Sequence, residues 1–187
     1  MFEGLKKKYI DWEISKLWKN KKREKQFLNW QEVKKIILLY DRTTLKPDVL
    51  KPDVLKQIFA MLDGKQIMAW TVVEKDEFKK ETINIAMLAP NEWNLLMKPK
   101  NFVLSRFNSF EADILIDLTM QEILPLKYLH AVSDVKCRCG LSRYGDITDF
   151  SIDRTPNMKE MDLLNQIIHY MTIINQKEKK LEREMVE

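Results

Sequence analysis

The sequence predicts an α/β fold, a three-layer sandwich with a mainly parallel, Rossmann-like sheet and an N-terminal helical extension. Two observations carry this prediction. Expected strands alternate with expected helices along the chain, and the strand segments are apolar on both faces. The 187 residues are 45% hydrophobic and 32% charged, which suits a chain with a buried core and excludes disordered and fibrous classes. We expect one α/β domain at residues 31–176, with a basic amphipathic helix at 1–30 and a charged tail at 177–187.

The first element is a helix over residues 2–26, a segment without proline and rich in lysine, glutamate and leucine. Its apolar side chains occupy a wide arc. We therefore expect the helix to dock on something, either its own domain, a second copy or another partner.

The remaining elements follow from apolar runs and breaker residues. Strands are expected at 33–40, 67–73, 82–88, 112–118, 135–139 and 149–152, the fifth ended by Gly140. Helices are expected at 52–62, 100–110 and 125–132. A long C-terminal helix is expected with Thr155 as its N-cap and Pro156 as its first residue, fraying beyond Gln176. Leu45–Val49 recurs unchanged as Leu50–Val54, which we interpret as a surface duplication that precedes the helix at Pro52.

Three of these strands end in one pattern, an apolar residue, Asp, any residue and Thr. The three Asp–Thr pairs are Asp41 with Thr43, Asp117 with Thr119, and Asp153 with Thr155. Because the carboxyl ends of parallel strands share one edge of a sheet, the sequence predicts a common rim there. Carboxylates at such a rim can hold Mg²⁺, accept a sugar hydroxyl or act as a general base, and the hydroxyls can receive phosphate. The same residue types also cap the helices that follow strands, and this alternative stays open.

Other catalytic and metal patterns are absent from the sequence. Cys137 and Cys139 lie two apart on an expected strand and are interpreted as buried structural thiols, so no metal and no cofactor is expected. His130 has no acid partner at helical spacing, and His169 lies on a polar helix face. The chain has no P-loop, HExxH or kinase signature, and we expect no catalytic residue.

The positive charge is concentrated at the N-terminus. Residues 1–26 carry nine Lys and Arg against four acids, a surplus of five, whereas the whole chain has a net charge of +4. The predicted interaction surface consists of basic and aromatic residues: Lys6, Lys7, Lys8, Trp12, Trp18, Lys21, Lys22 and Arg23. This mixture suits RNA, a ribosome or an anionic membrane surface, as well as a homodimer or partner protein.

The location expected from the sequence is the cytoplasm. No apolar run approaches the roughly 20 residues of a membrane span, and the first residues lack the apolar region of a secretory signal. Two cysteines cannot form a disulfide framework.

Two resemblances arise. The segments Ala-Asp-Ile-Leu-Ile-Asp-Leu-Thr at 112–119 and Pro-Leu-Lys-Tyr-Leu-His-Ala-Val at 125–132, with the strand ending at Asp41 and the late His169-Tyr170, resemble a family of uncharacterised proteins of Bacteroidetes-type bacteria. Residues 113–140 are also similar, more distantly, to the N-terminal half of heptosyltransferase-like glycosyltransferases. This second resemblance implies a Rossmann-like half-domain. The nucleotide-sugar half of those enzymes does not fit into a chain of 187 residues.

The sequence therefore favours a non-catalytic binding or interaction module. Two alternatives stay open: a small-molecule or phosphosugar site at the carboxyl edge of the sheet, and RNA or ribosome binding through the N-terminal helix.

Overall fold

The sheet has six strands, and all of them are parallel. The computed structural model describes residues 2–20, 23, 25–42, 52–73 and 84–184. The strands are β1 (Lys35–Leu39), β2 (Gln66–Val72), β3 (Ile85–Leu88), β4 (Ile114–Asp117), β5 (Cys137–Leu141) and β6 (Phe150–Ile152). Their order is β3-β2-β1-β4-β5-β6. The chain builds outward from β1 to β3 and then returns to place β4 on the other side of β1. The β1/β4 boundary is therefore the topological switch point, where open α/β sheets bind ligands.

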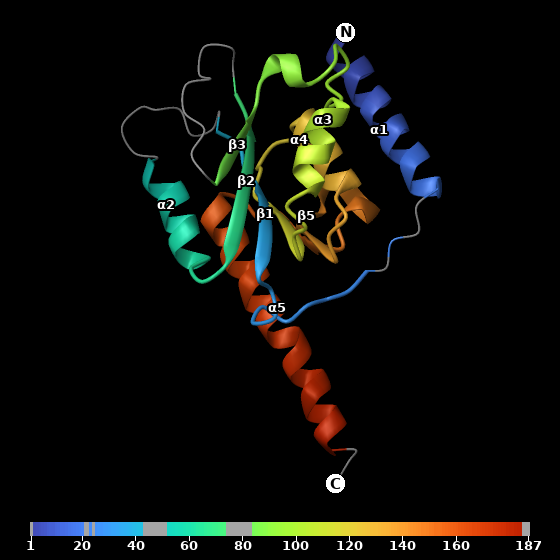
Figure 1. Ribbon diagram of the computed structural model, residues 1–187. Helices are drawn as coiled ribbons and strands as arrows, with labels where there is room; N and C mark the ends of the chain where they lie inside the picture. The colour runs from blue at the N-terminus through green and yellow to red at the C-terminus, as the bar shows by residue number, and fades with distance from the viewer. Residues whose placement is uncertain (1, 21–22, 24, 43–51, 74–83, 185–187) are drawn as a thin grey trace.

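Helices cover both faces of the sheet, which confirms the three-layer sandwich (Figure 1). The helices α2 (Pro52–Met61) and α5 (Glu160–Glu184) lie on one face, and α3 (Asn101–Asn108) and α4 (Leu124–Val132) on the other. The helix α1 (Phe2–Asn20) lies outside α4, as an additional layer. Two 3₁₀ turns complete the described elements, η3 (Pro90–Glu92) and η4 (Ser142–Ile147).

The alternation of side chains along β1 explains why both faces need helices. Ile36 and Leu38 enter the core that α2 and α5 cover, whereas Ile37 and Leu39 enter the core that α3 and α4 cover. All four are almost completely buried. Each is the kind of side chain whose burial contributes about 1.5–3 kcal/mol, so a strand apolar on both faces is stable only between two helical layers.

The N-terminal helix is shorter than predicted. It ends at Asn20, and the described residues beyond it are not helical up to β1. There the Gln26 N–H donates to the Lys136 carbonyl at 3.1 Å, and Arg23 donates to the Val135 carbonyl at 2.6 Å. The chain leaves the helix because these contacts attach it to the segment that precedes β5. Of the segment called 1–30, the structure thus shows a helix over 2–20 only.

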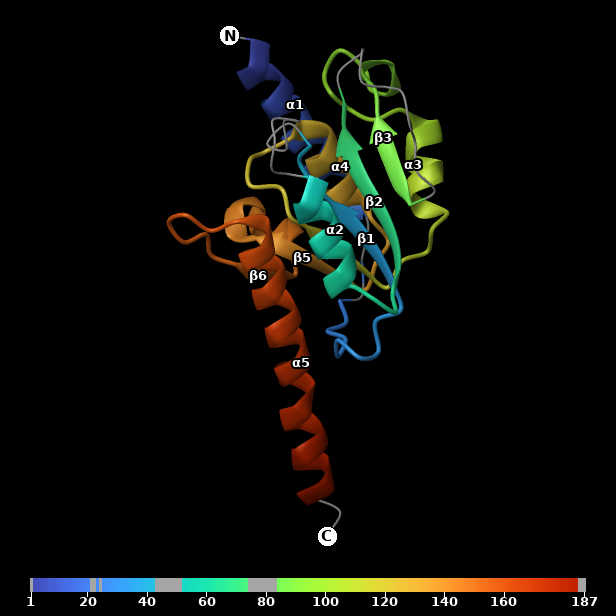
Figure 2. The same ribbon diagram turned by 90° about the vertical axis from the view of Figure 1, so that its left-hand side faces the viewer.

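The C-terminal helix also differs from the prediction. It begins at Glu160, not at Pro156. Thr155 and Pro156 belong to a turn, and Asn157 adopts a positive φ of 65°, so a helix cannot run through this residue. The side chain of Asp162 accepts a hydrogen bond from the Lys159 N–H at 3.0 Å and so supports the first turn. The helix does not fray at Gln176 but continues to Glu184, and Figure 2 shows it extending well below the sheet.

Gly140 lies inside β5 rather than ending the strand. A Cβ at this position would lie 3.2 Å from the Cβ and 3.2 Å from the carbonyl oxygen of Asp117 on the neighbouring strand. The glycine is required because the two strands and the side chain of Asp117 come this close together.

The duplicated segment at Leu45–Val54 and Thr43 lie largely or wholly outside the described residues, although α2 does begin at Pro52 as predicted. Among the described residues, no helix has the length and apolar character needed to cross a membrane.

Candidate functional site at the carboxyl edge of the sheet

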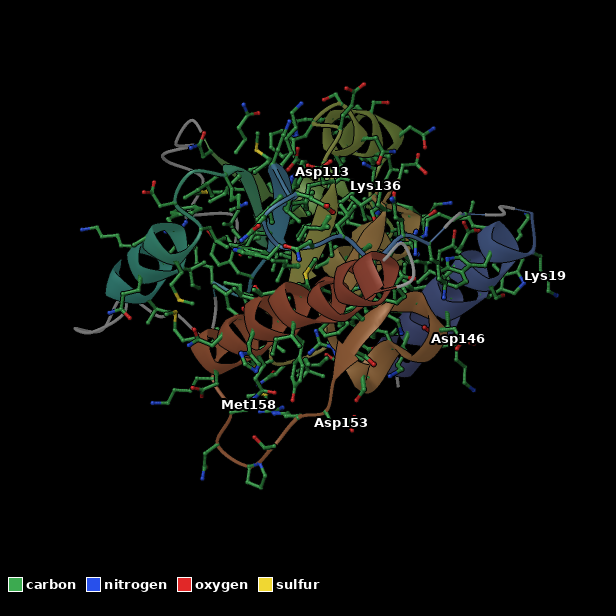
Figure 3. The ribbon with its side chains drawn as sticks, turned by 90° about the horizontal axis from the view of Figure 1, so that it is seen from below. Lys19, Asp113, Lys136, Asp146, Asp153 and Met158 are labelled. Atoms are coloured by element: carbon green, nitrogen blue, oxygen red, sulfur yellow. The ribbon has the colours of Figure 1, made fainter. Side chains whose placement is uncertain are left out.

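The switch point brings two of the three predicted aspartates onto adjacent strands. Leu39 of β1 pairs with Asp117 of β4, and Asp41 follows two residues after Leu39. Both carboxyl groups are buried, with Asp41 3% and Asp117 1% exposed. Asp153 follows β6, two strands beyond β4, and is exposed together with Thr155 (Figure 3). All three aspartates follow the carboxyl ends of strands in one sheet, but Asp153 lies at its outer margin.

Asp117 is the centre of a buried hydrogen-bond network. Its Oδ1 accepts from the Thr119 backbone N–H at 2.9 Å and from the Thr119 hydroxyl at 2.6 Å, a local turn that holds the chain as it leaves β4. Its Oδ2 lies 3.3 Å from His130 Nδ1 and 3.2 Å from Arg143 Nη2. A carboxylate offers about four acceptor positions, and four donors occupy them here. The alternative that this pair caps the following helix is wrong, because α4 has Ile123 at its N-cap and no side-chain cap hydrogen bond; Asp117 and Thr119 instead organise the loop after β4.

His130 links this carboxylate to η4 and the residue after it. The ring is fully buried on α4, and Thr148 Oγ1 lies 3.4 Å from its Nε2. Tyr144 meets the ring edge-on, with a centroid separation of 5.6 Å. Because Nδ1 faces an acceptor, the neutral ring places its proton there and accepts from Thr148 through Nε2.

The charge states follow from the surroundings. Burial by itself raises the pKa of Asp117, but the His130 hydrogen bond and the positive charge of Arg143 outweigh it and hold that pKa below the usual range. Burial lowers the pKa of His130, and the contact with Asp117 offsets only part of that effect. The pair therefore consists of an ionised carboxylate and a neutral imidazole at neutral pH.

Two arginines connect the loop after β4 to η4 and to the chain that follows β6. Arg143 from η4 also donates to the Thr119 carbonyl, and Arg154 after β6 donates to the Met120 carbonyl at 3.0 Å. The arrangement ties β4, η4 and the chain after β6 together. These hydrogen bonds stabilise the backbone at the carboxyl edge of the sheet.

A hollow of about 790 Å³ lies between the end of β2, the start of α4 and the start of α1. Val72, Ile123 and Leu124 supply its apolar wall, and Lys6 and Lys7 also line it. The Lys7 ammonium lies 2.7 Å from Glu122, which also lines the hollow, so this cation is already paired. The hydrogen bond and the charge of Glu122 raise the pKa of Lys7.

The structure divides the predicted interaction surface on α1 into an inner and an outer part. Trp18 is half-buried against the body, and its indole N–H donates to the Ala131 carbonyl at 3.2 Å. Arg23 pairs with Asp149. Lys8 and Trp12 are exposed, while Lys6 is partly covered. Lys21 and Lys22 lie outside the described residues.

Sequence reasoning missed the partners of Asp117. His130 and Arg143 are 13 and 26 positions away from it, Thr148, the partner of His130, is 31 away, and no helical or strand period connects them. The one usable signal was Gly140. Its lack of a side chain makes room for Asp117, and a Cβ at this position would lie 3.7 Å from Cε1 of the His130 ring. Cys137 and Cys139 are buried and unpaired by disulfide, with sulfur atoms 3.8 Å apart. Within the described ranges, no group of three or more His, Cys, Asp or Glu side chains is arranged to hold a metal ion.

Comparison with known families gave one match, a family described only as a family of unknown function, whose model covers residues 6–174. No curated protein and no solved structure matches the chain.

Proposed function

The chain belongs to DUF6913, a family of unknown function, and we propose from its geometry that it is a binding module that attaches to anionic phospholipid surfaces through the outer face of α1. The observation that carries this proposal is that α1 is anchored by one face while its opposite face is aromatic, basic, exposed and free of acidic residues. We define the outer face of α1 as Phe2, Leu5, Lys8, Trp12, Lys16 and Lys19, which follow one another at helical spacing; Tyr9 at its margin is partly buried against the body.

The inner face holds the helix firmly on the body. Ile10 is completely buried and Ile14 nearly so, and both pack on Tyr128 and Ala131 of α4. Because burial of two isoleucines contributes about 3–6 kcal/mol, α1 is a docked element with a defined orientation.

Two of the three acidic side chains of α1 contribute to that anchoring, whereas Glu3 is exposed near the start of the helix. Asp11 lies 2.6 Å from the ammonium of Lys127, and Glu13 pairs with Lys98. These ion pairs turn both carboxylates toward the body. The charge on the outer face of α1 therefore comes from its lysines.

Large apolar side chains are presented to solvent on the outer face. Phe2 is 79%, Leu5 57% and Trp12 54% exposed. Tyr9 lies against Trp12 with ring centroids 6.1 Å apart, and the Lys16 ammonium is 5.3 Å from the Trp12 ring. Figure 3 shows Lys19 directed away from the molecule at the end of the helix.

This combination matches helices that lie in a membrane interface. Such helices insert aromatic and leucine side chains at the headgroup level while lysines contact anionic lipids, at about 1 kcal/mol per lysine near the surface. Three lysines with a short apolar row predict reversible, salt-sensitive attachment.

The test is co-sedimentation of the full chain with vesicles of phosphatidylcholine alone or mixed with phosphatidylglycerol. We expect binding only to the mixed vesicles, a strong decrease at high salt, and loss of binding in Trp12→Ser and in Lys8→Glu with Lys16→Glu. Tyr170→Ser is the matched aromatic control, because Tyr170 is 46% exposed on α5, which covers the opposite face of the sheet from α4 and α1. Lys56→Glu with Lys159→Glu is the matched charge control. Equal binding to both vesicles, or equal loss in the controls, would refute the proposal. A dimer that only the outer-face variants disrupt would identify a second copy as the occupant instead.

A second candidate is a small-molecule site at the carboxyl edge, which the 790 Å³ hollow and its place beside the switch point favour. The resemblance of residues 113–140 to heptosyltransferase-like enzymes points to sugar phosphates as the first compounds to screen. A ligand-induced rise in melting temperature that Ile123→Trp abolishes would support it, and a screen without any rise would count against it.

A further inference from the structure

A second hollow lies at the opposite, amino edge of the sheet, between the end of α1, the end of α4 and β5. Its volume is about 470 Å³, within the range of small-molecule sites. Leu17, Trp18 and Val132 form apolar walls. Among the described residues, the charged side chains that line it are Arg23, Lys25 and Arg138, without an acidic one. We call it the amino-edge pocket.

Arg138 is the unusual member of this set. Its side chain is fully enclosed, with the residue only 2% exposed, on the second position of β5. The Nε donates to the Ser133 hydroxyl at 3.0 Å and Nη2 to the Ser133 carbonyl at 2.7 Å. The third nitrogen, Nη1, is buried without any hydrogen-bond partner.

The charge of Arg138 is incompletely balanced. Within the described part of the chain it forms no ion pair, and its guanidinium instead stacks over Trp18 at 5.2 Å from the ring centroid. Burial, and then the positive charge of neighbouring Arg23, lower the pKa of Arg138 to about 10, against the opposing effects of Asp149 and Asp134. A buried cation in this state is costly unless an anion reaches it.

The nearby carboxylate of Asp149 contacts other groups through Oδ2, whereas its Oδ1 is buried without a hydrogen-bond partner in the part of the chain that the structure describes. Oδ2 accepts from the Arg138 backbone N–H at 2.9 Å and pairs with Arg23, and Oδ1 lies 3.4 Å from the Lys25 ammonium. One carboxylate thus serves two cations and a backbone donor. None of its contacts reaches the guanidinium of Arg138.

We propose that the amino-edge pocket binds a phosphate ester with an apolar body, whose phosphoryl oxygens meet Arg138, Arg23 and Lys25 and whose apolar part lies against Leu17, Trp18 and Val132. Guanidinium groups match phosphate oxygens in planar, paired hydrogen bonds, and an unpaired Nη1 supplies the missing donor. The pocket belongs to the body and the inner side of α1, so the proposal stands independently of membrane attachment by the outer face.

The experiment is isothermal titration of the full chain with inorganic phosphate, n-hexyl phosphate and dihexanoyl phosphatidylglycerol. We expect hexyl phosphate to bind at least about tenfold more tightly than inorganic phosphate, because burying two methylenes already corresponds to this factor. Binding of the short-chain lipid in place of hexyl phosphate would support the pocket with a lipid headgroup as the ligand. Failure of all three compounds to bind would overturn the proposal.

Two variants locate the site. Lys25→Gln alters a half-exposed side chain and is expected to weaken binding about threefold to tenfold. Arg138→Lys keeps the charge but removes the paired donors, and we expect a loss of at least about tenfold. Lys136→Gln is the matched control. Lys136 directly precedes β5 and is about as exposed as Lys25, but its ammonium lies 3.8 Å from Asp113. The Trp12→Ser variant of the outer face should bind hexyl phosphate normally, which separates this proposal from the membrane proposal. Unchanged affinity in both Lys25→Gln and Arg138→Lys would overturn the assignment.

Discussion

The clearest test of the network at the carboxyl edge is Asp117→Asn, which changes one oxygen of a fully buried carboxylate into an amide nitrogen. The remaining oxygen can still accept both hydrogen bonds from Thr119. The new NH₂ group, however, is a donor that faces two donors, His130 Nδ1 and Arg143 Nη2. His130 can adapt by moving its proton to Nε2, since Thr148 can donate or accept. Arg143 cannot adapt, because a guanidinium has no acceptor.

The expected magnitude follows from the loss at Arg143. A hydrogen bond to a charged group contributes about 1.5–3 kcal/mol, and breaking a buried ion pair costs about 3–5 kcal/mol. The Arg143 side chain is 20% exposed and keeps the Thr119 carbonyl as a partner, so the upper limit does not apply. We expect the free energy of unfolding to fall by about 2–4 kcal/mol. The melting temperature should fall by about 4–16 °C for a domain of this size.

Urea denaturation followed by circular dichroism measures this change, and nitrogen chemical shifts of the His130 ring report the change of tautomer. Asp153→Asn is the matched control, because Asp153 is exposed and should change stability by less than about 0.5 kcal/mol. A destabilisation below about 1 kcal/mol in Asp117→Asn, or an unchanged His130 tautomer, would show that Asp117 is not the support described above. Its carboxylate would then be available to a ligand.

Two further changes test the same region. Gly140→Ala places a Cβ 3.2 Å from two atoms of Asp117, so we expect the free energy of unfolding, measured by urea denaturation, to fall by about 1–3 kcal/mol. Gly4→Ala is the control, because a Cβ there meets nothing within 4 Å and should stabilise α1 by up to about 1 kcal/mol. Equal effects at both glycines would disprove the close approach of Gly140 to Asp117. The second concerns pH. Burial lowers the pKa of His130 in the folded protein below the value of about 6.5 that it has in the unfolded chain, so the unfolded chain takes up the proton first as the pH falls. Stability from this group is therefore fully present above about pH 6.5 and is lost as the pH decreases toward the folded pKa, with a slope of at most about 1.4 kcal/mol per pH unit. Denaturation curves between about pH 5 and 7 should show this slope in wild type and in His169→Gln but not in His130→Gln; a slope that persists in His130→Gln would assign it to another group.

The linear pattern of the chain was sufficient for the architecture. Consecutive apolar residues such as Ile36 to Leu39 are typical of the middle layer of a sandwich, and strands that alternate with helices favour a parallel sheet. The same local reasoning placed Asp41, Asp117 and Asp153 at the carboxyl ends of strands in one sheet and located the positive charge on the N-terminal helix, whereas the pairing of β1 with β4 came from the structure. It was less successful at the ends of helices, because contacts distant in sequence decide where a helix stops. Arg23 and Gln26 reach the segment before β5, and this ended α1 at Asn20, six residues before the predicted end.

Everything that depends on two distant segments meeting was decided by the tertiary structure alone. Nothing in the order of residues shows that His130 and Arg143 share the carboxylate of Asp117, that Asp11 and Glu13 of α1 pair with the body while Trp12 is exposed, or that Arg138 is enclosed beside Trp18 without an ion pair among the described residues. Secondary structure follows from the spacing of apolar residues, which is a local property of the sequence. Charge compensation and hydrogen-bond satisfaction follow from distances of a few ångströms between side chains many residues apart, and only folding sets those distances.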